Sequence, residues 1–209
     1  MAGSLEGIKV LELGNYIAGP VCAMLLGDMG AEVIKIEPIQ IGDHTRHFPP
    51  IINGESACFA NLNRNKRSIA LDLKQPEARQ IMIELAKKSD VLVENYRPGA
   101  LEKLGLGPDD LRAVNPKLVY VSVSGYGQTG PYRRRAGVNF TVEAFAGSLS
   151  ITGEPDDKPM RTGIQTADVV SALFATYSAL TGLVGVLRNR DGRAFDVSLS
   201  ESKIGRAHV

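Results

Sequence analysis

The feature that most constrains this chain is the alternation of short β-like runs with segments of helical pattern. The predicted strands are rich in Val, Ile and Leu and cover residues 9–13, 32–37, 68–73, 90–94, 118–124 and 195–199. Residues 19–26 and 75–89 have the pattern of helices. Strands that alternate with helices form βαβ units, and apolar strands of this kind are buried on both faces. The sequence therefore predicts an α/β fold with a parallel sheet flanked by helices.

The charge balance and the composition exclude several classes of protein. The chain has 209 residues, with 24 Lys and Arg against 23 Asp and Glu, so its formal charge is only +1. That balance argues against binding nucleic acid through a basic surface, and 44% hydrophobic residues argue against disorder. Cys22 and Cys58 give no disulfide framework, and the N-terminus lacks the pattern of a secretory signal. We therefore expect a cytoplasmic protein.

One uncharged stretch, residues 169–187, is nominally long enough to cross a bilayer. It contains two glycines and several Ser, Thr and Tyr residues, and Asp168 and Arg188 bracket it. This composition favours a helix packed against a sheet or a partner subunit over a membrane span. We therefore expect no membrane partner.

The end of the chain differs in character from the segment before it. Its last seven residues, KIGRAHV, match the translation of a common sequencing adapter. We therefore expect residues 1–202 to be the natural N-terminal part of a larger domain, and residues 203–209 to be a non-native tail. A natural tail is the alternative, because a strand followed by a chain end is compatible with both.

Two turns follow predicted strands at the edge where doubly wound sheets bind ligands. Residues 14–20 (GNYIAGP) open a helix but do not match the G-x-G-x-x-G fingerprint of NAD-binding proteins. They can form a backbone-lined pocket for a phosphate or an adenine, or an ordinary strand–helix turn. After the fourth strand, Asn95, Tyr96 and Arg97 offer an aromatic ring and a cation at the same edge.

Cations gather in residues 63–67 (NRNKR) and again in residues 133–135. Both runs can contact an anionic ligand, but each is also typical of a solvated charged surface. His44 and His47 lie in one loop without the Cys or acidic neighbours of a metal site, so we predict no bound metal.

Asp168 is the strongest candidate for a catalytic side chain. It is the only charged residue between Arg161 and Arg188, and it stands at the head of the long apolar helix. A helix N-terminus stabilises a carboxylate by about 0.3–1 kcal/mol, and an ionised carboxylate in a dry site can act as a nucleophile. The structural alternative is an aspartate that only caps the helix, which is common at this position.

Several segments, taken together and in this order, resemble one known family. They are LEGIKVLELGNYIAGPVCAMLLGDMGAEVIKIEP, NRNKRSIALDLK, VLVENYRPGALEKLGLG, VYVSVSGYGQTGPY and TGIQTADVV. The family is that of the class III CoA-transferases, which includes formyl-CoA transferase and carnitine CoA-transferase, and the resemblance covers residues 5–202. It implies a Rossmann-like large domain that binds CoA, a small second domain and an interlocked homodimer. The chain resembles the N-terminal portion only, truncated before the second domain.

The resemblance also implies roles for residues of this chain. The family's catalytic aspartate falls on Asp168, within TGIQTADVV. The family's CoA contacts fall on Ile17, Ala18, Leu71, Asp72, Leu73, Lys74, Asn95, Tyr96, Arg97, Lys103 and Arg135. The chain departs from the family at Pro38, where many transferases carry an arginine that contacts a phosphate or a ribose.

The implied reaction moves CoA from an acyl-CoA to a small carboxylic acid, with CoA as a substrate and no permanently bound cofactor. The Asp168 carboxylate would form a mixed anhydride with the acyl group and then an aspartyl-CoA thioester. An acceptor carboxylate and a second attack by the CoA thiolate would complete the transfer, in a site that excludes water.

Two alternatives remain open at this point. An α-methylacyl-CoA racemase shares the fold and the CoA site, but its histidine falls where this chain has Val138 and Asn139, which cannot act as bases. The other alternative is a module that binds CoA or another nucleotide without chemistry. Because the family builds part of the acyl pocket from a later glycine-rich segment, we expect the 209-residue chain alone to bind CoA weakly and to be inactive in turnover. We also expect exposed apolar surface along residues 169–187.

Overall fold

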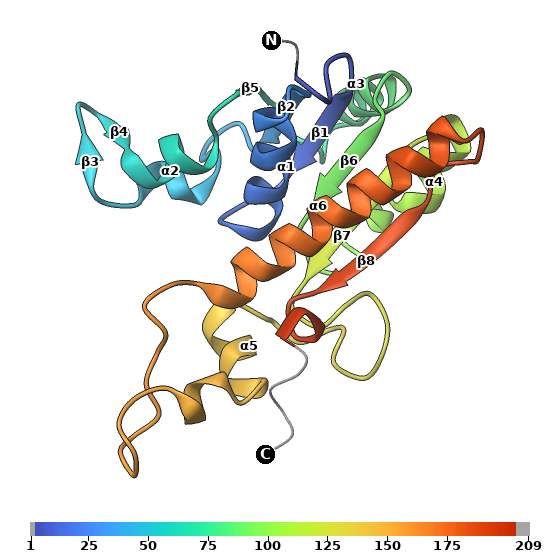
Figure 1. Ribbon diagram of the computed structural model, residues 1–209. Coiled ribbons are helices and arrows are strands. Elements are labelled where there is room, and N and C mark those ends of the chain that lie inside the picture. Colours follow the sequence, from blue (N-terminus) through green and yellow to red (C-terminus); the bar gives the residue numbers. More distant parts are fainter. Residues whose placement is uncertain (1–2, 204–209) are drawn as a thin grey trace.

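The computed structural model describes residues 3–203 and contains a six-stranded sheet whose neighbouring strands all run parallel (Figure 1). The strands of this sheet are β1 (Lys9–Leu13), β2 (Glu32–Glu37), β5 (Lys66–Ala70), β6 (Val91–Glu94), β7 (Val119–Ser124) and β8 (Ala194–Ser198). Their order across the sheet is β5-β2-β1-β6-β7-β8. The predicted α/β fold with a parallel sheet is confirmed.

The order of the strands places a topological switch point between β1 and β6. From β1 the chain moves outward through β2 to β5, and from β6 it moves outward through β7 to β8 in the opposite direction. The connections that follow β1 and β6 therefore diverge and open a crevice at the carboxyl ends of these two strands. Parallel α/β sheets bind their ligands at this place.

Helices cover both faces of the sheet. On one face lie α1 (Ala18–Asp28) and α6 (Thr166–Leu187), and on the other lie α3 (Pro76–Ala86) and α4 (Pro108–Val114). The remaining two helices pack on neighbouring helices, α2 (Ala57–Leu62) on α1 and α5 (Asn139–Phe145) on α6. Successive strand residues point to opposite faces, so Val93 joins the apolar core under α1 and α6. Its neighbour Leu92 joins a second core under α3 and α4. Both faces of β6 are therefore buried, as its apolar sequence predicts.

A stripe of small residues brings α6 close to the sheet. The buried residues of this helix are Ala167, Ser171, Ala172, Ala175, Thr176, Ala179, Gly182 and Leu183, and the helix packs on α1 and β7. At Gly182 an added Cβ would lie 2.5 Å from a methyl carbon of Val119. Only glycine therefore allows this close approach of helix and strand.

The opposite face of α6 is apolar and exposed, as the sequence predicts. Its exposed large apolar residues are Val169, Leu173, Phe174, Tyr177, Val184 and Leu187, which are between 38% and 79% exposed. By length and composition α6 could also cross a membrane. In the structure one face of α6 packs on the sheet, as the sequence predicts for this helix.

The segment between β2 and β5, in which the sequence predicts a loop with His44 and His47, contains short elements of secondary structure. It contains the 3-10 helix η1 (His44–His47), the hairpin of β3 (Ile51–Ile52) and β4 (Glu55–Ser56), and α2. The hairpin and α2 project to one side of the molecule, beyond α1 (Figure 1). The remaining 3-10 helices are η2 (Glu102–Leu104), η3 (Ser148–Ile151) and η4 (Glu201–Lys203). Elements this short have no full period that a sequence pattern could reveal.

The third predicted strand is displaced in the structure. The sequence predicts residues 68–73, whereas β5 covers Lys66–Ala70. Leu71 still donates a backbone hydrogen bond to the Glu37 carbonyl, but Asp72 then closes a turn by accepting from the Lys74 N–H at 3.1 Å. Residues 71–74 are therefore a loop at the carboxyl edge of the sheet, and not the end of a strand.

Candidate functional site

Three neighbouring pockets follow the carboxyl edge of the sheet. The Asp168 pocket (530 Å³) lies at the switch point, the Leu71 pocket (470 Å³) lies beside β2 and β5, and the arginine pocket (690 Å³) lies beyond β6. Tyr96 lines both the Asp168 pocket and the Leu71 pocket. Arg97 and Arg135 line both the Asp168 pocket and the arginine pocket. Volumes in this range suit small-molecule sites. The residues that line two pockets each connect the three pockets.

The Asp168 pocket brings together predicted site residues from four separate parts of the chain. They are Ile17, Ala18, Asn95, Tyr96, Arg97, Arg135 and Asp168. The first two follow β1 and the next three follow β6, and these strands pair with each other. Because the carboxyl ends of paired parallel strands share one edge, residues about 80 positions apart meet here.

The other predicted CoA contacts line the two flanking pockets. Leu71, Asp72, Leu73 and Lys74 line the Leu71 pocket, together with Pro38. The arginine pocket gathers the cations Arg97, Lys103, Arg133, Arg134 and Arg135. Within residues 3–203 none of these five cations forms an ion pair with a carboxylate. One acidic residue, Glu102, also lines this pocket, so the lining keeps an excess of positive charge.

Asp168 lies in the first turn of α6 but does not cap it. The N-cap residue is Gln165, so Asp168 is the third residue of the helix. Asn139 and Glu143 of α5 accept the first N–H groups of α6 in its place. Among the described residues no donor contacts the Asp168 carboxylate, and its side chain lines the pocket. The interpretation of Asp168 as a capping residue is therefore wrong.

The surroundings of Asp168 favour its neutral form. Burial raises the pKa of its carboxyl from 3.8 to about 6, and the negative charge of Glu143 adds to this shift. The Glu143 carboxyl is fully buried, but hydroxyl donors from Thr166 and Thr162 outweigh its burial and lower its pKa. Asp168 is thus ionised at neutral pH but held in an unfavourable environment, which is typical of reactive groups.

The turn after β1 is held to the turn after β6 by paired amides. The Asn15 N–H donates to Asn95 Oδ1 at 2.9 Å, and Asn95 Nδ2 donates to the Asn15 carbonyl at 2.8 Å. The next residue, Tyr16, has a left-handed backbone with a φ of 65°, a conformation that costs a non-glycine residue free energy. Its ring stacks on His44 with centroids 5.2 Å apart. The turn that lines the Asp168 pocket is therefore fixed from both sides.

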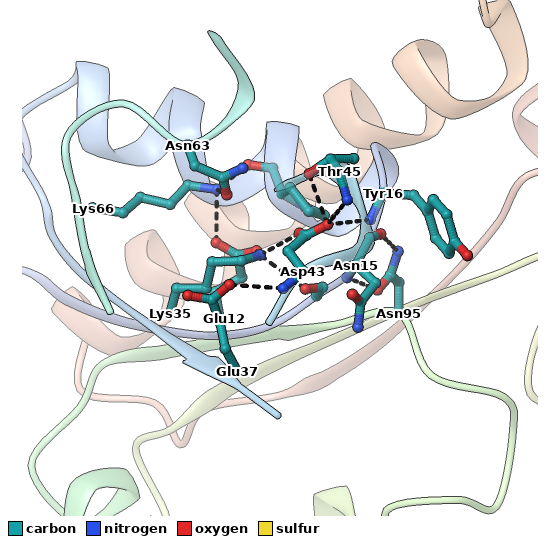
Figure 2. Close-up of polar contacts among 12 residues, drawn as sticks. Glu12, Asn15, Tyr16, Lys35, Glu37, Asp43, Thr45, Asn63, Lys66 and Asn95 are labelled. Atoms are coloured by element: carbon teal, nitrogen blue, oxygen red, sulfur yellow. Dashed lines mark hydrogen bonds and ion pairs between the residues drawn. The ribbon is translucent and has the colours of Figure 1, made fainter. Parts of the chain in front are cut away.

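A cluster of buried charges lies directly beneath this turn (Figure 2). The Lys35 ammonium is 2.5 Å from Glu12 and 2.8 Å from Asp43, and it donates to the Gly14 carbonyl at 2.8 Å. Lys66 approaches the second oxygen of Glu12 at 2.7 Å. All four charged side chains are at most 2% exposed. Figure 2 shows the Tyr16 ring extending away from this buried ion cluster.

Each cation of the NRNKR run forms an ion pair, but only Lys66 belongs to the buried ion cluster. Lys66 pairs with Glu12, Arg64 with Asp28 at 2.5 Å, and Arg67 with Glu32 at 3.2 Å. Burial lowers the pKa of Lys66 to about 8, although the Glu12 charge opposes this. Lys66 is therefore buried in an ion pair, whereas Arg64 and Arg67 lie on the solvated surface that the sequence also predicts, where each pairs with a carboxylate.

A further carboxylate, Glu94, ends β6 under the pocket. Its Oε2 accepts from the Tyr96 N–H at 2.7 Å, which fixes the start of the turn over residues 95–97. Glu94 is 5% exposed, and burial raises its pKa to about 7. The turn that carries Tyr96 and Arg97 therefore rests on a group that titrates near neutral pH.

Sequence reasoning missed several residues that line the Asp168 pocket. The polar ones among them are Tyr16, Ser124, Asn139 and Gln165. From the sequence, Asn139 is notable only as a residue that cannot act as a base. Its position beside Asp168 depends on the packing of α5 against α6, which no local pattern encodes. The left-handed backbone of Tyr16 likewise has no signal in a non-glycine residue.

Comparison with known proteins identifies the family. The family model of CoA-transferase family III matches residues 5–206. The chain belongs to CoA-transferase family III. Over 201 residues it is 44% identical to the succinyl-CoA:glutarate CoA-transferase of Mus musculus, a match that covers 96% of this chain and 46% of the mouse protein. It is also 44% identical to the succinyl-CoA–D-citramalate CoA-transferase of Chloroflexus aurantiacus, over 94% of this chain and 49% of that protein.

A solved structure supports the same family membership. The fold matches a CAIB/BAIF family protein from Brucella suis with a TM-score of 0.93 and 37% sequence identity. The match covers 98% of this chain and 55% of the Brucella suis protein. The chain therefore spans about half the length of the curated relatives and the solved structure that it matches.

Proposed function

We propose that this chain carries the CoA site and the nucleophile of a class III CoA-transferase, which moves CoA from an acyl-CoA to a carboxylic acid. The observation that carries this proposal is the Asp168 carboxylate, which lines the pocket at the switch point without a protein donor among the described residues. A carboxylate that is not engaged by the protein can attack the carbonyl carbon of a thioester.

The proposed reaction conserves the energy of the thioester on Asp168. A carboxylate oxygen attacks the acyl carbon of acyl-CoA, the carbon–sulfur bond breaks, and the CoA thiolate leaves a mixed anhydride behind. The thiolate then attacks the aspartyl carbonyl carbon and releases the donor carboxylate. The acceptor carboxylate attacks this aspartyl-CoA thioester, and the freed thiolate attacks the acceptor acyl carbon of the new anhydride. The products are a new acyl-CoA and the ionised Asp168, with no net change in protons.

In this proposal, each of the three pockets binds a different part of acyl-CoA. The Leu71 pocket offers the side chains of Leu71, Leu73 and Tyr96 to the adenine. The arginine pocket offers an excess of cations to the phosphate groups, which guanidinium groups bind well. The Asp168 pocket holds the carboxylate, and Arg97 and Arg135 line the same pocket. CoA is a substrate in this proposal and leaves in each cycle.

The names of the relatives support a dicarboxylic substrate class. Relatives from Mus musculus and Chloroflexus aurantiacus are named for transfer from succinyl-CoA to glutarate and to D-citramalate. We extend the proposal to succinyl-CoA as donor and a dicarboxylate as acceptor. A second carboxylate on either substrate could pair with Arg97 or Arg135, which line the same pocket as Asp168. We also propose that the whole protein is a cytoplasmic homodimer.

Trapping with hydroxylamine tests the covalent step without requiring turnover. The chain is incubated with succinyl-CoA and hydroxylamine, and its peptides are examined by mass spectrometry. An aspartyl anhydride or thioester reacts with hydroxylamine to give a stable hydroxamate, which we expect on Asp168. The Asp168→Asn chain is the matched control, because it keeps the shape of the side chain and loses the nucleophile.

The other functions predict different results in the same experiment. A module that only binds CoA would retain CoA at equilibrium and give no hydroxamate. A racemase would exchange the α-proton of a 2-methylacyl-CoA with deuterated water and give no hydroxamate. Either result would contradict CoA transfer through Asp168.

A further inference from the structure

The first turn of α6 is capped by side chains of α5. The Oδ1 atom of Asn139 accepts from the Ala167 N–H at 3.0 Å and from the Asp168 N–H at 3.2 Å. Glu143 accepts from the Thr166 N–H at 3.1 Å. Asn139 is 5% exposed and Glu143 is fully buried. The two residues are four positions apart, so they share one face of α5.

Without this cap, the helix would compete for the Asp168 carboxylate. Acidic side chains in the first turn of a helix readily accept from free N–H groups of that turn. Such a bond favours the ionised form, lowers the pKa of the carboxyl and directs its oxygens toward the backbone. Because Asn139 already accepts from Ala167 and Asp168, the helix leaves this carboxylate unengaged.

We infer that Asn139 is a positioning residue, which caps α6 in place of Asp168 and so leaves the Asp168 carboxylate free to attack a thioester. The inference rests on the proposed function, because that function gives the free carboxylate its use. Asn139 acts through the backbone of Ala167 and Asp168, and not by contact with a substrate.

The neutral charge of Asn139 is part of this role. Its Nδ2 faces the Glu143 carboxylate and lowers the pKa of that group, but it completes no hydrogen bond among the described residues. An aspartate at this position would keep the accepting oxygen and add a negative charge between Glu143 and Asp168. The other charged groups around Asp168 are Lys203 of η4, which lies 3.7 Å from Glu143, and Arg97 and Arg135 on the pocket wall.

Two substitutions of Asn139 should shift the pKa of Asp168 in opposite directions. In Asn139→Ala the cap is lost, the Asp168 carboxylate turns to the helix backbone, and its pKa falls by about one unit. In Asn139→Asp the cap remains but the added charge raises the pKa of Asp168 by about one unit. A carbon-13 NMR titration of the Asp168 carboxyl carbon measures both shifts in the intact chain.

A matched control separates positioning from general loss of structure. Asn115 also ties two segments together, because its Nδ2 donates to the carbonyls of Ala86 and Ser89. Asn115→Ala should destabilise the chain and leave the pKa of Asp168 unchanged. Equal shifts in all three variants, or an unchanged pKa in Asn139→Ala, would overturn the inference.

The hydroxylamine experiment distinguishes this inference from the proposed function. Asn139→Ala should form the Asp168 hydroxamate about tenfold more slowly than the parent chain, because the engaged carboxylate is a weaker nucleophile. If the parent chain forms no hydroxamate while the two pKa shifts appear, the proposed function fails and the capping role of Asn139 stands. If the parent chain forms the hydroxamate and the pKa shifts do not appear, the proposed function stands and the role of Asn139 fails.

Discussion

The ammonium group of Lys35 lies 2.5 Å from the Glu12 carboxylate, and both side chains are sealed from solvent. Glu12 and Asp43 raise the pKa of Lys35 against the effect of its burial, so Lys35 stays charged. Through its bond to the Gly14 carbonyl, this pair fixes the turn that lines the Asp168 pocket. The integrity of the pocket therefore depends on a buried ion pair that does not line it.

Lys35→Met should lower the free energy of unfolding by about 3–5 kcal/mol, because it leaves the buried Asp43 carboxylate without its cation and Glu12 with Lys66 alone. Urea denaturation followed by circular dichroism measures this change. Lys87→Met is the matched control, since Lys87 pairs with Glu84 at 2.6 Å on the exposed surface and its loss should change stability by about 0.5 kcal/mol or less. Equal effects of the two substitutions would show that the buried pair contributes no more to stability than the exposed pair.

Two glycines of α6 should respond to alanine with opposite signs. At Gly182 the new Cβ would lie 2.5 Å from Val119 and 3.0 Å from Phe195, so Gly182→Ala should destabilise the chain by about 1–3 kcal/mol. At Gly185 nothing lies within 4 Å of the new Cβ, so Gly185→Ala should stabilise it by about 0.5–1 kcal/mol. Thermal melts of the two variants test the close packing of α6 on β7, and a stabilised Gly182→Ala chain would refute it.

Removing one cation from the shared wall of two pockets should weaken binding of CoA. Arg97→Gln keeps much of the side chain but loses a charge-assisted contact to phosphate, which should lower the affinity for CoA about tenfold, or by about 1.4 kcal/mol. Isothermal titration calorimetry at two salt concentrations measures the affinity and its dependence on ionic strength. Arg190→Gln, an exposed arginine just before β8 at the opposite edge of the sheet, should leave the affinity unchanged. The same loss in both variants would point to net charge alone.

Asp168→Asn should make the chain more stable at neutral pH. The pKa of this carboxyl is about 6 in the folded chain against 3.8 in the unfolded one, so above pH 6 both states are ionised and the folded state bears the cost of a buried charge. Removing that charge should stabilise the fold by about 1–3 kcal/mol at pH 7. The gain should shrink as the pH falls from 6 and vanish below about pH 4, where Asp168 is protonated in both states. Urea titrations between pH 4 and pH 8 would reveal a constant difference if Asp168 were not perturbed.

Much of this fold could be predicted from local sequence. β1 and β2 begin and end where the sequence predicts, because their apolar runs are bounded by turn residues and buried on both faces. The third strand could not be placed correctly, because Lys66 belongs to it. A lysine argues against a buried strand until its partner, Glu12, is known, and that partner lies in β1.

The residues of the candidate site also differ in whether the sequence could predict them. Asp168 could be found because it is the only charge near a long apolar helix, and residues 95–97 could be found because they directly follow a predicted strand. Asn139 could not be found, since its role depends on where α5 meets the first turn of α6. Features that arise from one segment are visible in the sequence, whereas features that arise from two distant segments appear only in the folded chain.

Mass spectrometry of the chain after brief incubation with succinyl-CoA and acid quenching tests the central claim most directly. If Asp168 is the nucleophile, the peptide that contains it will carry CoA as a thioester, and the Asp168→Asn chain will carry none. If the chain binds CoA at equilibrium yet no peptide carries it, or if the thioester forms at another carboxylate, then Asp168 is not the group that accepts CoA.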